Sequence, residues 1–466
     1  MTSDNDQKTE GLGYKRISRR EMLKISAVGA VGLAVAPLLA ACSPTTSAPA
    51  ATSATAATSA AAATSAPTSM SSGGSPAVVR FWCWYTEQQD QFPKIISDFE
   101  AKNPNIKIDL QLKTDVTNAY LPALLAAAAA DDLPEVYAPH VHSVEFGRKG
   151  LAADLVKELG SDFMTDFFPS AVSMFQDGAA IYAVGWMAQT MGIFYDPDAF
   201  AKAGISGEPE SWDDMIAASN ALKSKISGNL GLMQSASDGF SVCDTWLPMI
   251  TAVSDDPDIL KKLDAHELKW TEQAVVDSLT LYKKTIDGGT WQKNMTGMTQ
   301  DDCKNAFYQG QSAAYYSGSW NPTTFYKDGP ADLIKRLKVM KTPAFKAGGR
   351  HWTGNSAGAA FSVSAHSKVK DAALTFFKYL YSPDVYAWTM NNSKSMPATK
   401  AAAAQITDPL TKDMASWLPD GCRHWLTGPA GQVIADAIMN FTAGKTTDPV
   451  AVAQIMEDGA AKLKYS

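Results

Sequence analysis

Residues 78–112 read VVRFWCWYTEQQDQFPKIISDFEAKNPNIKIDLQL, and this stretch decides the fold class. The β-branched and aromatic run at 78–85 predicts a buried strand. Apolar residues recur at helical spacing over 92–99, and the Asn-Pro-Asn of 103–105 ends that helix. Over 106–112 apolar and polar residues alternate, which is typical of a second strand. A strand, a helix and a strand at this spacing form a βαβ unit, whose crossover implies a parallel pair.

The same alternation continues along the chain and predicts an α/β protein. A helix over 119–130 precedes a strand at 134–137. Further strands are expected at 179–184 and 191–195. Amphipathic helices are expected at 211–224, 271–286 and 370–381.

The N-terminus carries the pattern of an export signal. Twin arginines at 19–20 precede a modest apolar run that is shorter than the about 20 residues needed to span a bilayer. This resembles a twin-arginine signal, and Leu-Ala-Ala-Cys at 39–42 resembles a bacterial lipobox. We therefore expect 1–41 to be a signal peptide and Cys42 to be lipidated. The alternative is an uncleaved membrane anchor with an incidental cysteine.

The residues after the signal separate into a linker and a folded part. Residues 42–76 are mostly Ala, Ser, Thr, Pro and Gly, which cannot bury enough apolar surface to fold, so they predict a tether. The part from 77 to 466 is too long for one ordinary core, so we expect two lobes.

Composition excludes some partners and leaves the cysteines open. The net charge is −7 with no basic cluster, which argues against nucleic acid and anionic membrane surfaces as partners. Cys83, Cys243, Cys303 and Cys422 are expected to be buried thiols or to form one disulfide. No CxxC or His-rich spacing indicates a metal site. We expect a monomer without cofactor.

Five motifs, in order, carry a family resemblance. They are the aromatic strand at 80–84, the Tyr-Asp-Pro-Asp stretch at 195–198 with Ser-Trp-Asp-Asp at 211–214, Phe-Tyr-Gln-Gly at 307–310, Ser-Gly-Ser-Trp at 317–320, and 354–364 with the helix that follows. Together they resemble the family 1 extracellular solute-binding proteins of ABC importers, which include the maltose-binding proteins. The family usually has Tyr-Asn where this chain has Tyr195-Asp196, a departure from its pattern.

The resemblance implies a two-lobed, type II-like periplasmic-binding fold that closes on its ligand by a hinge. The chain is then expected to cross between lobes near 186–190, 340–344 and 382–386. Lobe 1 would be 77–187 plus 343–382, and lobe 2 would be 188–342 plus 383–466. It also implies a carbohydrate ligand, delivery to a membrane permease, and ATP hydrolysis by a separate subunit.

Carbohydrate binding needs aromatic planes for the C–H faces of the sugar and planar polar groups for its hydroxyls. The candidate residues follow strand ends, the first crossing, and polar loops, where ligands of α/β sheets lie. Most could equally be core or surface residues, and Gln189 stands where the family residue is often acidic. The candidates are Trp84, Tyr85, Glu87, His142, Trp186, Gln189, Asp244, Trp246, Trp320, Trp352, Asn355, Arg423 and Trp425. His140 precedes His142 in the same loop, and Trp82, Trp212 and Trp388 are expected in the core.

Other functions remain as alternatives. A similar fold could bind a polyamine, a peptide or a glycerophosphodiester, which would need convergent carboxylates or basic residues and helix N-termini. A surface glycoside hydrolase would need two carboxyls facing each other across a cleft, whereas the paired aspartates here are adjacent in sequence at turns and helix starts. HExxH and P-loop motifs are absent from the sequence, so no catalytic residue is predicted and we expect no enzyme.

Overall fold

A computed structural model describes residues 75–465 of the chain, and these belong to one compact unit. The expected signal peptide, the lipidated Cys42 and nearly all of the linker lie outside the described residues. Within 75–465, no helix is long and apolar enough to span a bilayer.

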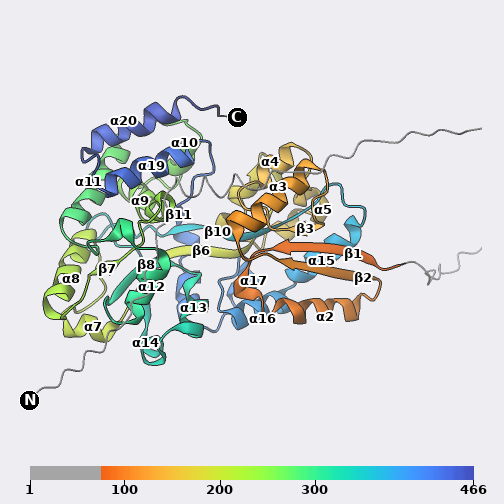
Figure 1. Ribbon diagram of the computed structural model, residues 1–466, viewed down its shortest axis with the longest axis horizontal. Helices are drawn as coiled ribbons and strands as arrows, with labels where there is room; N and C mark the ends of the chain where they lie inside the picture. The colour runs from red at the N-terminus through yellow and green to blue at the C-terminus, as the bar shows by residue number, and fades with distance from the viewer. Residues whose placement is uncertain (1–74, 466) are drawn as a thin grey trace, which may run out of the picture. The chain divides into compact units, whose positions relative to one another are not determined.

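The first βαβ unit forms as predicted (Figure 1). Strand β1 (Ala77–Cys83) pairs in parallel with β2 (Ile106–Leu112), starting at Ala77 opposite Ile106. Helix α2 (Phe92–Lys102) connects them and buries Phe92, Ile95 and Phe99. At its end, both the backbone N–H and the side-chain nitrogen Nδ2 of Asn103 donate to the Phe99 carbonyl, which closes the last turn of the helix.

One mixed sheet runs through the molecule in the order β2-β1-β3-β10-β6-β8-β7. The remaining members are β3 (Val136–Tyr137), β6 (Val184–Tyr195), β7 (Leu232–Met233), β8 (Ala314–Gly318) and β10 (Gly354–Val363). Strand β9 (Lys338–Met340) pairs with β6, and β11 (Cys422–Arg423) with β10. A separate hairpin joins β4 (Gln176–Asp177) to β5 (Ala180–Ile181). The α/β fold class is confirmed.

The strands predicted at 179–184 and 191–195 both form, but with other limits: the first is only β5, and β6 extends the second back to Val184. Strand β6 is continuous because its first half pairs with β10 and its second half with β8 and β9. The residues between the expected strands, 185–190, are almost all buried. The predicted first crossing, at 186–190, lies inside this strand.

The helices form two groups, which we call the first and second lobes (Figure 1). The first lobe holds α2, α3 (Leu121–Ala129), α4 (Ser143–Arg148), α5 (Leu155–Leu159), α6 (Ser161–Met164), α15 (Lys370–Leu380), α16 (Pro383–Ser393) and α17 (Lys400–Ala403). The second holds α7 (Pro197–Lys202), α8 (Trp212–Lys225), α9 (Gly239–Ser254), α10 (Ile259–Asp264), α11 (Gln273–Asp287), α12 (Gln300–Tyr308), α13 (Asn321–Asp328), α14 (Ala331–Arg336), α19 (Gly431–Thr442) and α20 (Pro449–Ala460). Helix α18 (Pro409–Ala415) contacts β6 and β9.

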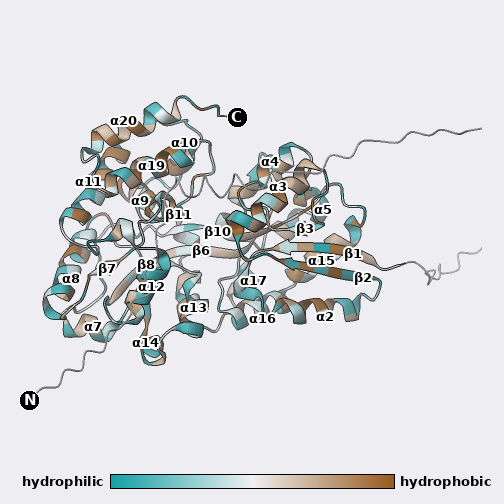
Figure 2. Ribbon diagram, in the orientation of Figure 1, coloured by the Kyte–Doolittle hydropathy of each residue, from teal (hydrophilic) through white to brown (hydrophobic). Residues whose placement is uncertain are grey.

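Two apolar cores fill the molecule. The first lies mainly in the first lobe and continues beneath α12, α13 and α14, and the other lies within the second lobe. The first core packs around Phe81, Phe361 and Phe376, whose rings meet edge to face at about 5 Å. The second packs around Trp246 and Trp270 beneath α9, α11 and α19. Figure 2 shows hydrophilic and hydrophobic residues interspersed along the helices of both lobes. Strands β6 and β10 run from one lobe into the other (Figure 1).

Two of the expected crossings lie elsewhere. The stretch expected to cross near 340–344 stays with the second lobe, because Ala344 bonds to Trp212; the chain crosses along β10 instead. The crossing expected near 382–386 is also displaced. Helix α16 packs in the first lobe, where the Tyr386 hydroxyl donates to the Trp186 carbonyl. The chain then returns to the second lobe through α18 and β11.

All four cysteines of the described chain are buried free thiols. Burial raises the pKa of Cys83, Cys303 and Cys422 to about 12, which makes their thiolates unavailable at neutral pH. Of the two alternatives drawn from the sequence, the structure has the buried thiols.

Candidate ligand-binding site

A pocket of about 290 Å³ lies beside the strands that connect the lobes. We call it the central pocket. Its aromatic lining includes Trp84, Tyr85, Trp320 and Trp425, and its polar lining consists of His140, Gln189, Asp244 and Gln300. Residues Ala357–Ala360 of β10 form its floor. Six of the predicted residues therefore meet in one place: Trp84, Tyr85, Gln189, Asp244, Trp320 and Trp425.

Three indoles reach the central pocket from separate parts of the chain. Trp84 follows β1 in the first lobe and packs edge to face against Tyr85 and Tyr120, each at 4.8 Å. Trp320 follows β8 and Trp425 follows β11, both in or near the second lobe. All three are only partly buried, so ring surface remains for a ligand.

Two glycines make room for pocket side chains. A Cβ on Gly318 of β8 would stand closer than 3.0 Å to three ring carbons of Trp320. A Cβ on Gly358 of β10 would similarly meet the side-chain amide of Gln189. Since a real Cβ does not approach another heavy atom so closely, each glycine is required for its neighbour's position. The indole and the amide are thus seated on the sheet backbone.

Gln189 and Asp244 supply the central polar groups. The Gln189 oxygen Oε1 accepts from the Ser356 hydroxyl at 3.2 Å, which holds the amide at the pocket wall. Asp244 lies in the first half of α9, whose N-cap Asp238 accepts from the Ser241 amide at 2.8 Å. Burial raises the pKa of Asp244 well above its usual value, and the nearby charge of Asp238 adds to this. A protonated carboxyl can donate as well as accept hydrogen bonds.

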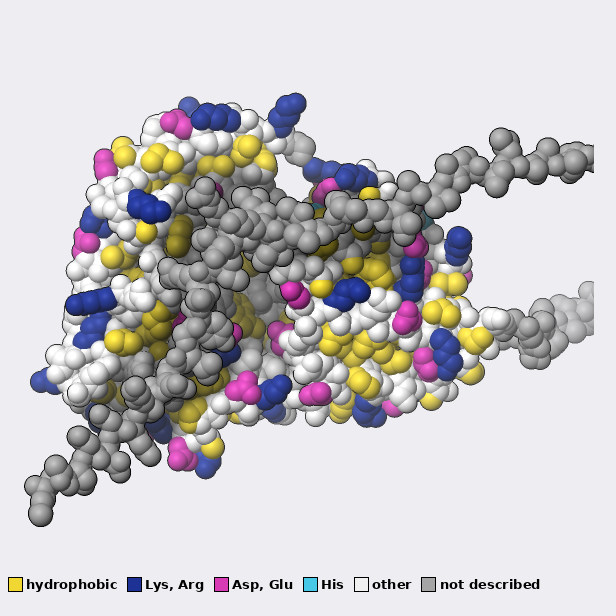
Figure 3. All heavy atoms as spheres, in the orientation of Figure 1, with side chains coloured by type: hydrophobic (Ala, Val, Ile, Leu, Met, Phe, Trp, Pro, Cys, Tyr) yellow, Lys and Arg dark blue, Asp and Glu magenta, His cyan; other side chains and the backbone are white. Residues whose placement is uncertain are grey.

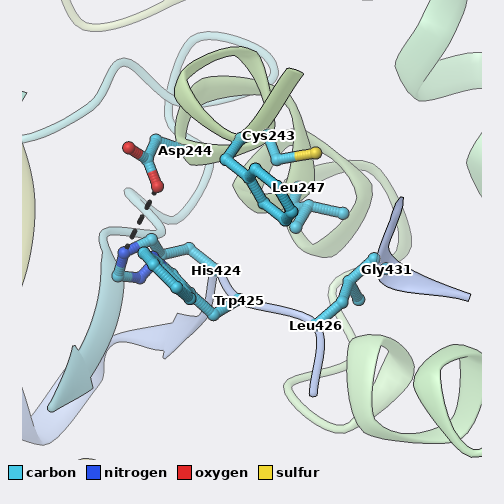
Figure 4. Close-up of a pocket in the computed structure, with 8 residues that line it drawn as sticks. Cys243, Asp244, Leu247, His424, Trp425, Leu426 and Gly431 are labelled. Atoms are coloured by element: carbon cyan, nitrogen blue, oxygen red, sulfur yellow. Dashed lines mark ion pairs between the residues drawn. The ribbon is translucent and has the colours of Figure 1, made fainter. Parts of the chain in front are cut away.

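A buried histidine faces Asp244 from the other side (Figure 4). The His424 ring nitrogen Nε2 lies 3.7 Å from the Asp244 oxygen Oδ1. Burial lowers the pKa of His424 to about 3, so the imidazole is neutral at physiological pH. The small pocket drawn in Figure 4 is otherwise apolar, lined by Cys243, Leu247 and the neighbouring Trp425. Asp244 therefore separates an apolar recess from the central pocket.

His140 lines the central pocket in place of the predicted His142. His142 is turned away from the central pocket, where its Nδ1 pairs with Glu145 Oε2 at 3.0 Å. His140 lines the pocket and has a φ of 53°, a left-handed conformation that re-aims its side chain. Its Nδ1 has no hydrogen-bond partner among the described residues.

Three predicted tryptophans lie in the core and are no longer proposed as ligand residues. Trp186 is fully buried among aromatic rings, and its Nε1 donates to Gln88. Trp246 is equally buried and donates to Ser278. Trp352 donates to Asp255 at 3.1 Å beneath the Arg350 guanidinium. In each case a partner inside the protein satisfies the indole N–H, as is usual for buried tryptophan.

The last three candidates lie around the central pocket rather than in it. Glu87 is in the single turn η1 (Thr86–Gln88), and burial raises its pKa. Asn355 accepts from Thr190 at 2.6 Å and donates to the Leu418 carbonyl at 3.0 Å. Arg423 pairs with Asp264 at 3.1 Å. Asn355 and Arg423 line a larger compartment that adjoins the central pocket.

Sequence reasoning missed Gln300, Met174 and Phe175, which also line the central pocket. Gln300 is the first residue of α12 and lies between the two capping-box residues, Thr299 and Asp302. That capping pattern explains the local sequence without any ligand. The structure also shows no group of three His, Cys, Asp or Glu side chains that could hold a metal within residues 75–465.

Comparisons with known proteins identify the family of the chain. The family described as bacterial extracellular solute-binding protein matches residues 85–387. The multiple sugar-binding protein of Streptococcus mutans is 22% identical over 301 residues, which cover 63% of this chain and 68% of that protein.

Two crystal structures illustrate the shared fold. The GacH receptor of Streptomyces glaucescens, solved unliganded and with acarbose, has a TM-score of 0.70 at 21% identity, covering 83% of this chain and 98% of that one. The sugar-binding protein MalE of Xanthomonas citri has a TM-score of 0.68 at 21% identity, with the same coverage. The chain therefore belongs to the bacterial extracellular solute-binding proteins, and it has their two-lobed fold.

Proposed function

We propose that this protein binds a carbohydrate in the central pocket and delivers it to the permease of an ABC importer. The observation that carries the proposal is the convergence of Trp84, Trp320 and Trp425 with Gln189, Gln300 and Asp244. Indole faces match the C–H faces of a sugar, while the amides and the carboxyl match its hydroxyls. The names of the relatives, which bind sugars or acarbose, support this class of ligand.

The proposed mechanism is closure of the lobes on the ligand. Trp84 belongs to the first lobe and Trp320 to the second, so a sugar held between them gains contacts in the closed state. A ligand that prefers the closed state shifts the population toward it. The closed form then docks on the permease, and a separate ATPase subunit supplies the energy.

We further propose export and lipid attachment through Cys42, with residues 42–76 as the tether. The lipobox-like Leu-Ala-Ala-Cys and the twin arginines support this placement. Replacement of Cys42 by serine should release the protein from membranes, and labelling with a radioactive fatty acid should disappear. Retention of label by Cys42→Ser would contradict the proposal.

The charge of the central pocket disfavours the other ligand classes. Asp244 is its only carboxyl, and its lining includes neither lysine nor arginine among the described residues. A polyamine would need several convergent carboxylates, and a phosphodiester would need cations or helix N-termini. Glycoside hydrolysis needs two facing carboxyls, so we propose binding without catalysis.

A thermal-shift screen of the purified protein tests the proposal. The ligands are mono- and oligosaccharides, polyamines, glycerophosphodiesters and peptides. A ligand at 100 times its dissociation constant should raise the free energy of unfolding by about 2.7 kcal/mol. Trp320→Ala should abolish the shift. Trp388→Ala should preserve it, because the structure exposes this indole on α16 and does not bury it in the core as predicted. A shift with a charged solute and none with any sugar would replace the proposed ligand.

A further inference from the structure

We propose that the ligand is an oligosaccharide of at least three rings, which extends from the central pocket past Trp425 into a second compartment. The inference rests on the proposed function and specifies the ligand further. The second compartment has a volume of about 990 Å³, compared with about 290 Å³ for the central pocket. Both are lined by Met174 and Trp425, so the two spaces are adjacent and share a wall.

The second compartment lies between the lobes, as the central pocket does. One side comes from residues 168–178 and Lys400 of the first lobe. The other comes from 257–261, at the start of α10, and from 418–425 around β11. A ligand that fills it is therefore held by both lobes, and each additional ring adds contacts that closure can strengthen.

The volumes decide against a single sugar. Ligand pockets for drug-sized molecules span roughly 300–1,000 Å³. The central pocket stands at the lower end, with space for one or two rings, and the second compartment alone stands at the upper end. A monosaccharide would fill only a small part of these two adjacent spaces.

Charges in the second compartment favour a neutral chain. Lys261, Lys400 and Arg423 contribute positive charge, and Asp177 and Asp258 contribute negative charge. Several are already engaged within the protein: Asp177 with Arg148 at 2.8 Å, Arg423 with Asp264 at 3.1 Å, and Lys400 with the Thr165 carbonyl at 2.8 Å. A polyanion or a polycation would meet like charge there, whereas hydroxyls can bond to either sign.

The charge pattern of the surrounding surface is similarly mixed. On the face drawn in Figure 3, basic and acidic side chains are interspersed over both lobes. In the compartment itself, the Ser170 hydroxyl has no hydrogen-bond partner among the described residues. Such a group is suited to a ligand hydroxyl.

A chain-length series tests the inference. Calorimetric titration of the full protein would use gluco-, xylo- and chito-oligosaccharides of one to five rings. Affinity should rise from the disaccharide to the tetrasaccharide by about tenfold or more, which corresponds to about 1.4 kcal/mol. Ser173→Trp, at an exposed position lining only the second compartment, should remove this rise. Ser161→Trp, equally exposed but outside both spaces, is its matched control and should retain the rise.

A second pair of smaller substitutions keeps the test valid if the Ser173 variant misfolds. Lys261→Ala should weaken tetrasaccharide binding several-fold, and Lys269→Ala, an exposed lysine outside the compartment, should not. Equal affinity for disaccharide and tetrasaccharide, or a rise that survives both compartment variants, would overturn the inference and leave sugar binding intact. Binding of no sugar of any length would overturn the proposed function as well.

Discussion

Replacing Gly318 by alanine should displace the Trp320 indole and weaken ligand binding, although no ligand-contacting atom is removed. The new Cβ would lie closer than 3.0 Å to Cζ3, Cε3 and Cη2 of that ring. Carbon atoms pack at about 3.5–4.0 Å, so one of the two groups must move. Gly318 pairs with Met191 across β8 and β6 and is buried, so the sheet holds the backbone in place. The ring is therefore the group that moves.

The loss follows from what an aromatic anchor contributes. Removing a central aromatic contact costs about 2 kcal/mol or more of binding free energy. At about 1.4 kcal/mol per factor of ten, affinity should fall roughly 30-fold. Overpacking should also lower the free energy of unfolding by about 1–3 kcal/mol, so both quantities must be measured.

Calorimetric titration with the strongest sugar from the screen measures the effect on the folded fraction. Gly318→Ala and Trp320→Ala should lose similar affinity, and the double variant should lose little more than either, because all three lack the same stacked ring. Gly207→Ala is the matched control, since a Cβ there has no heavy atom within 4 Å. Wild-type affinity in Gly318→Ala, with Trp320→Ala impaired, would refute the proposed seating of the indole by this glycine.

Three further predictions concern the core, a titrating group and the thiols. Trp186→Ala should lower the free energy of unfolding by about 3–5 kcal/mol in urea titration, because the indole is fully buried. The folded fraction should bind sugar as before. Lost affinity at unchanged stability would show that Trp186 belongs to the binding site. Burial raises the pKa of Asp244 in the folded protein, so ionisation of this carboxyl lowers the free energy of unfolding. This destabilisation is absent below the pKa of the unfolded state and grows as pH rises from there through the pKa of the folded state. Asn cannot ionise, so the free energy of unfolding of Asp244→Asn should rise relative to that of the native protein as pH increases from acid to neutral. A difference that shrinks with rising pH would contradict the raised pKa. In a Cys42→Ser variant, the four buried thiols should not react with Ellman's reagent until denaturant is added, and reaction before denaturation would show that the cores open.

Local pattern was sufficient for much of the fold. The strand and helix of 78–112 formed within a residue or two of their predicted limits, because alternating and helical apolar spacing are short-range signals. The full length of strand β6 could not be predicted from local pattern. Its continuity depends on three partners that are distant in sequence, β8, β9 and β10. The displaced crossing at α16 has the same origin, since its place depends on the contact between Tyr386 and Trp186.

For the binding site, residue type alone could not predict which side chains line the pocket. Trp84 and Trp186 both end or follow apolar strand runs, and in sequence each is a plausible stacking residue. Only tertiary packing distinguishes them: Trp186 finds Gln88 for its N–H and four aromatic rings for its faces, whereas Trp84 keeps part of its surface at the pocket. His140 and His142 differ in backbone conformation and in partner: His140 has a left-handed φ, and the His142 ring pairs with Glu145.

The two seating glycines connect sequence, fold and function most directly. Gly318 and Gly358 lie on the two strands, β8 and β10, that flank β6 in the sheet. Neither has a positive φ, so backbone freedom does not explain them. Each instead leaves the volume that a side chain of the pocket occupies, one an aromatic plane and the other a planar amide. These are the two kinds of group that sugar recognition needs, and both are fixed to the sheet that joins the lobes. A pocket built this way keeps its aromatic and polar surfaces in register while the lobes move, which is what a protein that captures and releases a sugar by closure requires.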